Sequence, residues 1–298
     1  MRWRGRRGSA NIEDRRGQGG RIVRRGRRGA ARAGGIGGFG LIAILVVGWV
    51  LGIDVRPFLG LVGGDGYVQT QSAPTGTGPA TQADREMGQF VSVVLADTEA
   101  VWSGIFREQL GASYVPVTLV LFDGVTPSPC GNASGATGPF YCPADKKAYL
   151  DTAFFTTLER QMGAGGDFAA AYVVAHEVAH YVQDELGILE QANRIRAQAP
   201  EAEANAVSVR IELQADCYSG IWARLADERF DILERGDIQE AINAAHRIGD
   251  DYLQRRAGRV PAPHTFTHGT SEQRARWFDT GYRSADLTAC DTFSATRL

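Results

Sequence analysis

The sequence predicts an α+β fold in which helices outnumber strands around a small sheet, behind one N-terminal transmembrane helix. Apolar residues recur at helical spacing through most of the chain after residue 84, and only two short runs have a β-branched, strand-like composition. These elements do not alternate strictly, as they would in a parallel α/β fold. The 298 residues suffice for one sizeable core with appendages.

The first 33 residues form an Arg-rich head. They contain twelve Arg against Glu13 and Asp14, although the whole chain has a formal net charge of −2. The rest of the chain is therefore acidic. A head of this kind could bind nucleic acid. Because an uncharged stretch follows it, we expect instead a cytoplasmic head that orients a membrane anchor and contacts anionic lipid, with no nucleic-acid partner.

Residues 34–54 are the predicted transmembrane helix. The stretch "AGGIGGFGLIAILVVGWVLGI", between Arg32 and Asp54, carries no formal charge. As a helix its 21 residues rise about 31 Å, close to the ~30 Å of the hydrocarbon core. The preceding Arg residues place the N-terminus in the cytoplasm and the rest of this single-pass protein outside the cell membrane. A cleaved signal peptide is the alternative, but no small-x-small site follows. A twin-arginine signal is another, but the rest of its motif is missing.

Residues 55–83 are expected to form a flexible linker, since they become rich in Gly, Thr, Ser, Pro and Gln from residue 63 onward. A linker of this length keeps the following domain, residues 84–298, close to the membrane surface.

The first half of the domain is predicted to contain two helices and two strands. A helix covers 84–110 and stops at Gly111, and the strand "YVPVTLVLF" covers 114–122. The strand "KAYLD" covers 147–151, and a short helix covers 152–162.

The second half is predicted to be helical. Asp167 is a suitable N-cap for a helix that runs to Leu186 and stops at Gly187. Further helices are expected at 201–229, at 238–256 with Asp237 and Glu240 as a capping box, and at 271–280.

The four cysteines fall on the predicted outer side, where an even number favours two disulfides. Cys130 and Cys142 bracket a turn-rich loop, so proximity pairs them. Cys217 would then pair with Cys290 and tie the C-terminal tail to the body. This is one of three possible pairings. A cysteine metal site is the alternative, but the sequence has no C-x-x-C spacing.

The stretch "VVAHEVAHYVQ", residues 173–183, contains the H-E-x-x-H pattern. His176 and His180 are four residues apart, so both rings project from one helix face and can bind one metal ion. A catalytic zinc takes three protein ligands and lowers the pKa of a bound water to about 7. Glu177 can then act as the general base. A chance match is the alternative, but the apolar neighbours predict a buried helix, where unpaired His side chains are costly.

The third ligand must come from another part of the chain. The stretch "RIELQADCYSG" offers Glu212 and Asp216 on one helix face. We expect Glu212 to complete a site for one Zn²⁺ per chain, and Asp216 to accept the free ring N–H of a ligating His. A solvated acidic face is the alternative, which the apolar neighbours disfavour. The remaining candidates for the third ligand are Asp216 itself, Glu203, His246, His264 and His268.

Longer motifs carry a family resemblance. H-E-x-x-H followed by E-x-x-x-D resembles the gluzincin zinc peptidases. The stretches "GPFYCPADKKAYLD", "GDFAAAYVVAHEVAHYVQ", "ELQADCYSGIWA" and "FTHGTSEQRARWFDTGY" resemble the bacterial neutral zinc metallopeptidases, over about residues 84–298 and in the anchored architecture. The resemblance implies a zincin-like fold with the substrate aligned along an edge strand, for which "KAYLD" is the candidate.

His268 and Arg274 form an H-x-x-x-x-x-R pattern after the metal motifs. It resembles an element of membrane-associated gluzincins in which a His or Arg stabilises the tetrahedral oxyanion. The resemblance implies a catalytic role for His268, and an oxyanion or structural role for Arg274. The alternatives are a capping or core role for His268 and a surface salt bridge for Arg274.

Together these observations predict a membrane-anchored zinc endopeptidase. Its substrate would be a polypeptide, and its lipid contacts would be made by the transmembrane helix and the Arg-rich head. The alternative function is a catalytically silent, zinc-stabilised scaffold that binds partners at the cell envelope. The presence of Glu177 favours the enzyme, because a scaffold does not need a general base.

Overall fold

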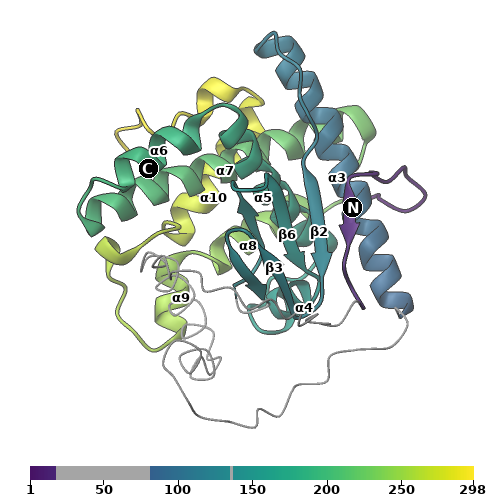
Figure 1. The fold of residues 1–298 in the computed structure, drawn as a ribbon, viewed down its shortest axis with the longest axis horizontal. Coiled ribbons are helices and arrows are strands. Elements are labelled where there is room, and N and C mark those ends of the chain that lie inside the picture. The colour runs from purple at the N-terminus through teal and green to yellow at the C-terminus, as the bar shows by residue number, and fades with distance from the viewer. Residues whose placement is uncertain (18–80, 135–136) are drawn as a thin grey trace, which may run out of the picture.

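The computed structural model describes residues 1–17, 81–134 and 137–298 (Figure 1). The predicted transmembrane helix at 34–54 and nearly all of the predicted linker at 55–83 lie outside these ranges. Within them, no helix combines the length and the apolar character needed to cross a bilayer. The described part is a helix-rich α+β fold with small sheets, as the sequence predicts.

Helix α5 (Asp167–Glu185) lies at the centre of the helical layer. Its residues are mostly Ala, Val and aromatic, and nearly all of its faces are buried. It packs against α3 (Gln82–Gln109), α7 (Glu201–Phe230) and α8 (Asp237–Arg247), while α10 (Ser271–Ser284) packs along α7. Gly187, with φ of 73°, follows α5 in the left-handed conformation that its sequence position predicts.

Two features of the helices differ from the prediction. The helix expected at 238–256 is two helices, α8 and α9 (Asp250–Arg256). The break occurs at Gly249, whose backbone is so close to the start of α10 that a Cβ would lie 2.4 Å from the Ser271 nitrogen. Helix α6 (Ile188–Arg196), which follows Gly187 directly, was not expected. The short helix expected at 152–162 is α4 (Ala153–Arg160).

The larger sheet has the strand order β1-β2-β6-β5. Strands β1 (Ile12–Asp14), β2 (Thr118–Phe122) and β6 (Lys147–Asp151) are parallel neighbours, and β5 (Phe140–Cys142) is antiparallel to β6. Strand β2 begins at Thr118 rather than at 114, after Pro116, which has no N–H to donate.

Alternate residues of β2 face two different cores. Leu119 and Leu121 join the main core with the helices. Val120 and Phe122 join a smaller cluster with residues of β4, β5 and β6. A hairpin of β3 (Val125–Ser128) and β4 (Gly131–Ser134) thus lies on the face of the sheet opposite the helices (Figure 1). This period of two explains why every residue after Thr118 in the strand is buried.

The expectation that "KAYLD" is an edge strand is wrong. This segment is β6, which pairs with β2 on one side and β5 on the other. Ala148, Tyr149 and Leu150 are each at most 2% exposed, as residues of an interior strand should be. Among the described strands the two edges of this sheet are β1 and β5, and β5 is the edge beside α5.

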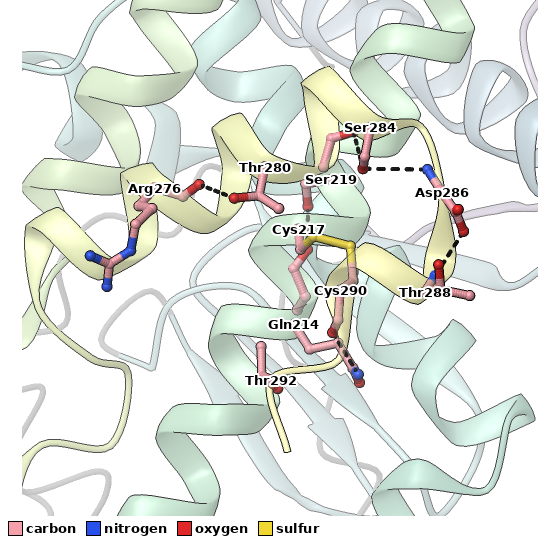
Figure 2. Close-up of a disulfide and its surroundings, with 12 residues drawn as sticks. Gln214, Cys217, Ser219, Arg276, Thr280, Ser284, Asp286, Thr288, Cys290 and Thr292 are labelled. Atoms are coloured by element: carbon pink, nitrogen blue, oxygen red, sulfur yellow. Dashed lines mark hydrogen bonds between the residues drawn. A yellow bond between two sulfur atoms is a disulfide. The ribbon is translucent and has the colours of Figure 1, made fainter. Parts of the chain in front are cut away.

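Both predicted disulfides are confirmed. Cys130 pairs with Cys142, and Cys217 of α7 pairs with Cys290. Figure 2 shows the second bond joining α7 to the short turn that follows α10. The bridge closes a 73-residue separation and fixes the C-terminal segment against the helix that carries Glu212.

The first 17 residues do not form a separate head. They pack against the domain, with Met1 and Trp3 buried in the main core and β1 paired with β2. The predicted head at 1–33 therefore has to be divided. Residues 1–17 belong structurally with residues 81–298, and residues 18–33 lie outside the described ranges.

Candidate metal centre

Two adjacent helices bring three potential metal ligands together. His176 and His180 project from α5, and Glu212 projects from α7. One donor atom from each lies within 4.8 Å of the others. His176 Nε2 is 3.1 Å from one oxygen of Glu212, and His180 Nε2 is 3.5 Å from the other. Two imidazoles and one carboxylate form a ligand set that catalytic zinc takes in peptidases.

The ring nitrogen of His180 that faces away from Glu212, Nδ1, is hydrogen-bonded to the side-chain amide of Gln183. His180 Nδ1 lies 2.9 Å from Gln183 Oε1, which can only accept, so Nδ1 carries the proton and Nε2 keeps its lone pair for a metal. Gln183 in turn donates to the carbonyl of Ile211 and to Gln214 Oε1 at 2.8 and 3.0 Å. Gln214 donates to the carbonyl of Cys290 at 3.1 Å (Figure 2). The ring orientation is thus linked to the Cys217–Cys290 bridge.

The outer nitrogen of His176 faces a buried carboxylate. His176 Nδ1 lies 3.0 Å from Asp216 Oδ1, at hydrogen-bonding distance although poorly aligned. Asp216 is completely buried and also accepts the hydroxyl hydrogen of Tyr172. This is the partner that the spacing of Glu212 and Asp216 predicts for a ligating His.

Arg274 points at Asp216. Its side chain is 2% exposed, with Nε 2.9 Å from one Asp216 oxygen and Nη2 3.0 Å from the other. Burial disfavours the charge, but Asp216 and Glu212 hold the pKa of Arg274 well above its ordinary value. Of the roles considered for Arg274, this geometry supports the structural one. It excludes a surface salt bridge, because the pair is buried.

His268 lies in the loop before α10 and keeps 41% of its side chain exposed. Asp250, the first residue of α9, holds this loop. One Asp250 oxygen accepts the backbone N–H groups of Thr267, His268 and Gly269 at 2.8, 2.6 and 3.0 Å. The other lies 3.3 Å from His268 Nδ1. Burial lowers the pKa of His268, but Glu212 and Asp250 together raise it above its ordinary value.

The electrostatics of the metal-free pocket differ between neighbouring groups. Burial lowers the pKa of His180 to about 4. His176 is also penalised by burial, yet Asp216 and Glu212 raise its pKa to about 9. Burial raises the pKa of Glu177 to about 7, so this carboxyl group titrates near neutral pH. A group poised near the working pH is suited to general-base catalysis.

The remaining candidates for a third ligand are not part of the donor set. Glu203 and His264 are exposed, and His246 is half-buried on α8. The three donors converge, and the ring nitrogens of His180 and His176 that face away from Glu212 lie against Gln183 and Asp216, so the residues present fit a zinc ion.

Sequence reasoning missed four supporting residues: Tyr172, Gln183, Gln214 and Asp250. Two had a usable signal. Tyr172 is four residues before His176, and Gln183 is three residues after His180, so both share the motif's helix face. Gln214 and Asp250 had no such signal, because their partners lie 31 and 18 residues away in the sequence.

Comparison with known proteins gives a consistent result. A family model described as "Putative neutral zinc metallopeptidase" matches residues 1–293. The chain is 43% identical to "Uncharacterized protein YpfJ" of Escherichia coli K12, over 98% of this chain and 99% of that one. It is 43% identical to "Uncharacterized protein Rv2575" of Mycobacterium tuberculosis H37Rv, over 67% of this chain and 68% of that one. No solved structure matches significantly.

Proposed function

Because this chain belongs to the family of neutral zinc metallopeptidases, we propose that it hydrolyses peptide bonds at a site built by His176, His180, Glu212 and Glu177. The observation that carries the proposal is the convergence of the two His Nε2 atoms on the Glu212 carboxylate. The buried Glu177 directly follows His176 in the sequence. His176, His180 and Glu212 would hold one zinc ion per chain.

A zinc ion held by these residues would polarise the scissile carbonyl and acidify a water molecule. Glu177 takes the proton of that water and passes it to the departing amine. Its burial supports this role, because burial raises the pKa of the Glu177 carboxyl in the metal-free site and so makes its carboxylate a better proton acceptor. Asp216 and Arg274 do not touch the substrate in this scheme. They fix the ring of His176.

His268 is proposed to donate a hydrogen bond to the developing oxyanion. The Asp250 carboxylate, 3.3 Å from His268 Nδ1, favours the imidazolium, in which both ring nitrogens are donors. Because Nδ1 faces Asp250, Nε2 remains for the substrate. Donors placed at a developing negative charge contribute several kcal/mol to catalysis in other acyl-transfer enzymes, about 3 kcal/mol for one donor.

The proposed substrate is an extended polypeptide, and β5 replaces "KAYLD" as the strand that aligns it. This strand is an edge of the sheet among the described residues and lies beside α5. An edge strand presents unpaired backbone groups that an extended peptide can pair with.

The location of the domain outside the cytoplasm is also a proposal. It is supported by the two disulfides, which persist in oxidising compartments. Contact of the uncharged stretch at 33–53 with lipid is a further proposal, supported by its length and composition.

The test combines zinc content with peptidase activity in the full-length protein. Purified wild type should carry one zinc per chain and cleave an unfolded, fluorescently labelled polypeptide. Glu212→Ala should lose the zinc. Glu177→Gln should keep it and lose activity by about 100-fold or more, because only proton transfer is removed. Glu185→Gln is the matched control, since it makes the same change on the same helix at a residue paired with Lys146.

Two outcomes would contradict the proposal. If folded wild type binds no zinc after reconstitution, the metal site is wrong. If wild type and Glu177→Gln bind zinc equally and neither cleaves any unfolded polypeptide, the catalytically silent scaffold becomes the better description.

A further inference from the structure

Residues 1–17 form a strap that adds a strand to the domain. Ile12, Glu13 and Asp14 pair in parallel register with Leu119, Val120 and Leu121 of β2 (Figure 1). The pairing includes a bond from the Leu119 nitrogen to the Asn11 carbonyl at 2.9 Å, and one from the Arg15 nitrogen to the Leu121 carbonyl at 2.7 Å. The strap therefore completes one edge of the sheet.

The start of the strap is anchored in the main core. Met1 and Trp3 are 6% and 7% exposed, and the Trp3 ring meets Phe90 of α3 edge-to-face at 5.4 Å. The Met1 nitrogen lies within 3.3 Å of one oxygen from each of three acidic side chains, Asp167, Glu234 and Asp237. Asp167 is the first residue of α5, so the strap also contacts the helix that carries the metal motif.

Acidic groups of the chain engage the Arg residues of the strap. Of its six Arg residues, Arg2, Arg6, Arg15 and Arg16 form ion pairs within the described chain. Arg6 binds both oxygens of the buried Asp97 at 2.5 and 2.6 Å. Four of the twelve Arg residues that predicted a lipid-binding head are therefore paired within the protein.

The end of the strap and the start of α3 are in contact, although the residues between them, 18–80, are many. Arg16 Nη1 donates to the carbonyl of Asp84, in the first turn of α3, at 2.5 Å. One crossing of a bilayer would separate those two residues by about 30 Å of hydrocarbon. The 21 uncharged residues at 33–53 are enough for only one crossing, since each needs about 20 residues. A docked strap and a single crossing therefore exclude each other.

We propose that the strap, residues 1–17, is a constitutive part of its own chain's peptidase domain and lies on the same side of the membrane as that domain. This places the N-terminus beside the domain rather than across a bilayer from it. Neither the docking of the strap nor its side of the membrane depends on zinc or on catalysis.

Cysteine labelling in spheroplasts tests the sidedness. Arg7→Cys, exposed in the strap, and Val260→Cys, 88% exposed in the domain, are treated separately with a membrane-impermeant maleimide. The native cysteines are all in disulfides, and the wild-type chain corrects for any that react. We expect both variants to be labelled or neither, and both to be labelled after detergent lysis. Labelling of one variant alone before lysis would overturn the proposal.

Cross-linking in the membrane fraction tests the docking. Ser9 and Ser92 exchange two hydrogen bonds, Ser9 N to Ser92 O at 2.9 Å and Ser92 Oγ to Ser9 O at 3.0 Å. The double variant Ser9→Cys/Ser92→Cys also contains an inserted protease site within residues 63–80, so that cleavage separates the strap from the domain. After a short bismaleimide and cleavage, the two fragments should stay joined at the mass of one chain, whereas each single-cysteine variant should separate. Separation of the double variant, or a product of doubled mass, would overturn the proposal.

Discussion

At the residue scale, the pocket is arranged so that metal binding must displace a proton. His176 has a pKa of about 9 in the metal-free protein, because the attraction of Asp216 and Glu212 outweighs its burial. His180, with a pKa of about 4, is already neutral at pH 7. A metal can bind only the neutral imidazole, so His176 has to lose its proton.

Zinc binding at pH 7 should therefore release about one proton from His176, with a smaller contribution from Glu177. The share of the release that comes from His176 should fall as the pH rises through 9, where His176 is already neutral, while a zinc-bound water gives up its own proton above about pH 7. Calorimetric titration of the metal-free protein, in buffers of different ionisation enthalpy, measures this number. A release near zero at pH 7 would show that His176 is neutral before zinc arrives.

Asp250 is expected to act on catalysis through His268. It helps to raise the pKa of His268, so Asp250→Asn should lower that pKa and shift the alkaline loss of activity to lower pH. We expect kcat to fall by about tenfold, less than the ~100-fold typical of removing an oxyanion donor outright, with KM little changed. Asp251→Asn is the control, because Asp251 binds Ser271 and Arg255 instead. Equal pH profiles for both variants would exclude this positioning role.

The same carboxylate stabilises the fold above about pH 4, and this contribution is lost in acid. Burial acts to raise the pKa of Asp250, but hydrogen bonds from His268 and the loop lower it below its ordinary value. A lowered folded-state pKa stabilises the fold above the unfolded pKa, near 3.9, and that contribution is lost as the pH falls through the folded value. The stability gap between wild type and Asp250→Asn should therefore be full at pH 6 and shrink below about pH 4 in urea titrations.

Site residues could be predicted from the sequence where they lie three or four positions from a partner on the same helix, and not where their partners are distant in the sequence. The residues predicted to converge were pairs on one helix face, because spacing of three or four fixes which side chains are neighbours. His176, His180 and Glu212 do converge. Gln214 and Asp250 act across turns and between helices, where no local period exists. For Arg274 the motif identified the residue, but only the packing of α10 on α7 shows that it faces Asp216.

At the element scale, α7 and α10 cross at two glycines. A Cβ on Gly220 would lie 2.0 Å from the Phe278 carbonyl oxygen, and one on Gly281 would lie 1.8 Å from the Cys217 carbonyl oxygen. The two backbones are therefore in direct contact. This contact sets the distance between Glu212 and Asp216 on one helix and Arg274 on the other.

Gly281→Ala should separate these helices and lower the free energy of unfolding by about 3 kcal/mol. It should also weaken zinc binding, because Arg274 moves away from Asp216. Gly104→Ala in α3 is the matched control, since a Cβ there meets nothing closer than 3.8 Å. Removing that helical Gly should stabilise the protein, by up to about 1 kcal/mol. Similar unfolding midpoints for the two variants in urea would contradict this account.

Long helices were predicted well because their apolar period and caps are local. Thr81 and Thr270 form the capping boxes that begin α3 and α10. Strands β1 and β5 have three residues each, too few to display a period. The break between α8 and α9 was missed because its cause is the approach of Ser271, a contact between distant segments.

At the scale of the whole molecule, the strap is a structural component of the domain. Trp3→Ala should lower the free energy of unfolding by about 3 kcal/mol, since it empties a buried site against Phe90. Val260→Ala, at an 88% exposed position, should change it by less than about 0.5 kcal/mol. Urea titration of the full-length variants measures both. An unchanged midpoint for Trp3→Ala would mean that the strap is not docked in solution.

The strap was missed because its charge dominated the interpretation. Twelve Arg in 33 residues predict a solvated head, and the apolar positions Met1, Trp3 and Ile12 are too widely spaced to display a pattern. The acidic groups that neutralise the Arg residues lie partly far along the chain, for example Asp97 and Asp231. Composition therefore predicts that this segment is basic, but it does not predict that acidic residues of the same chain bind it.

The added strand also has a consequence for recombinant work. A fragment that begins at residue 84 would leave one side of β2 without its neighbour, although "TLVLF" has strong β-propensity and no charge. An uncovered strand of this kind is a template for self-association. Such a fragment should form soluble oligomers or precipitate, and a synthetic peptide of residues 1–17 added during refolding should suppress that self-association in light scattering.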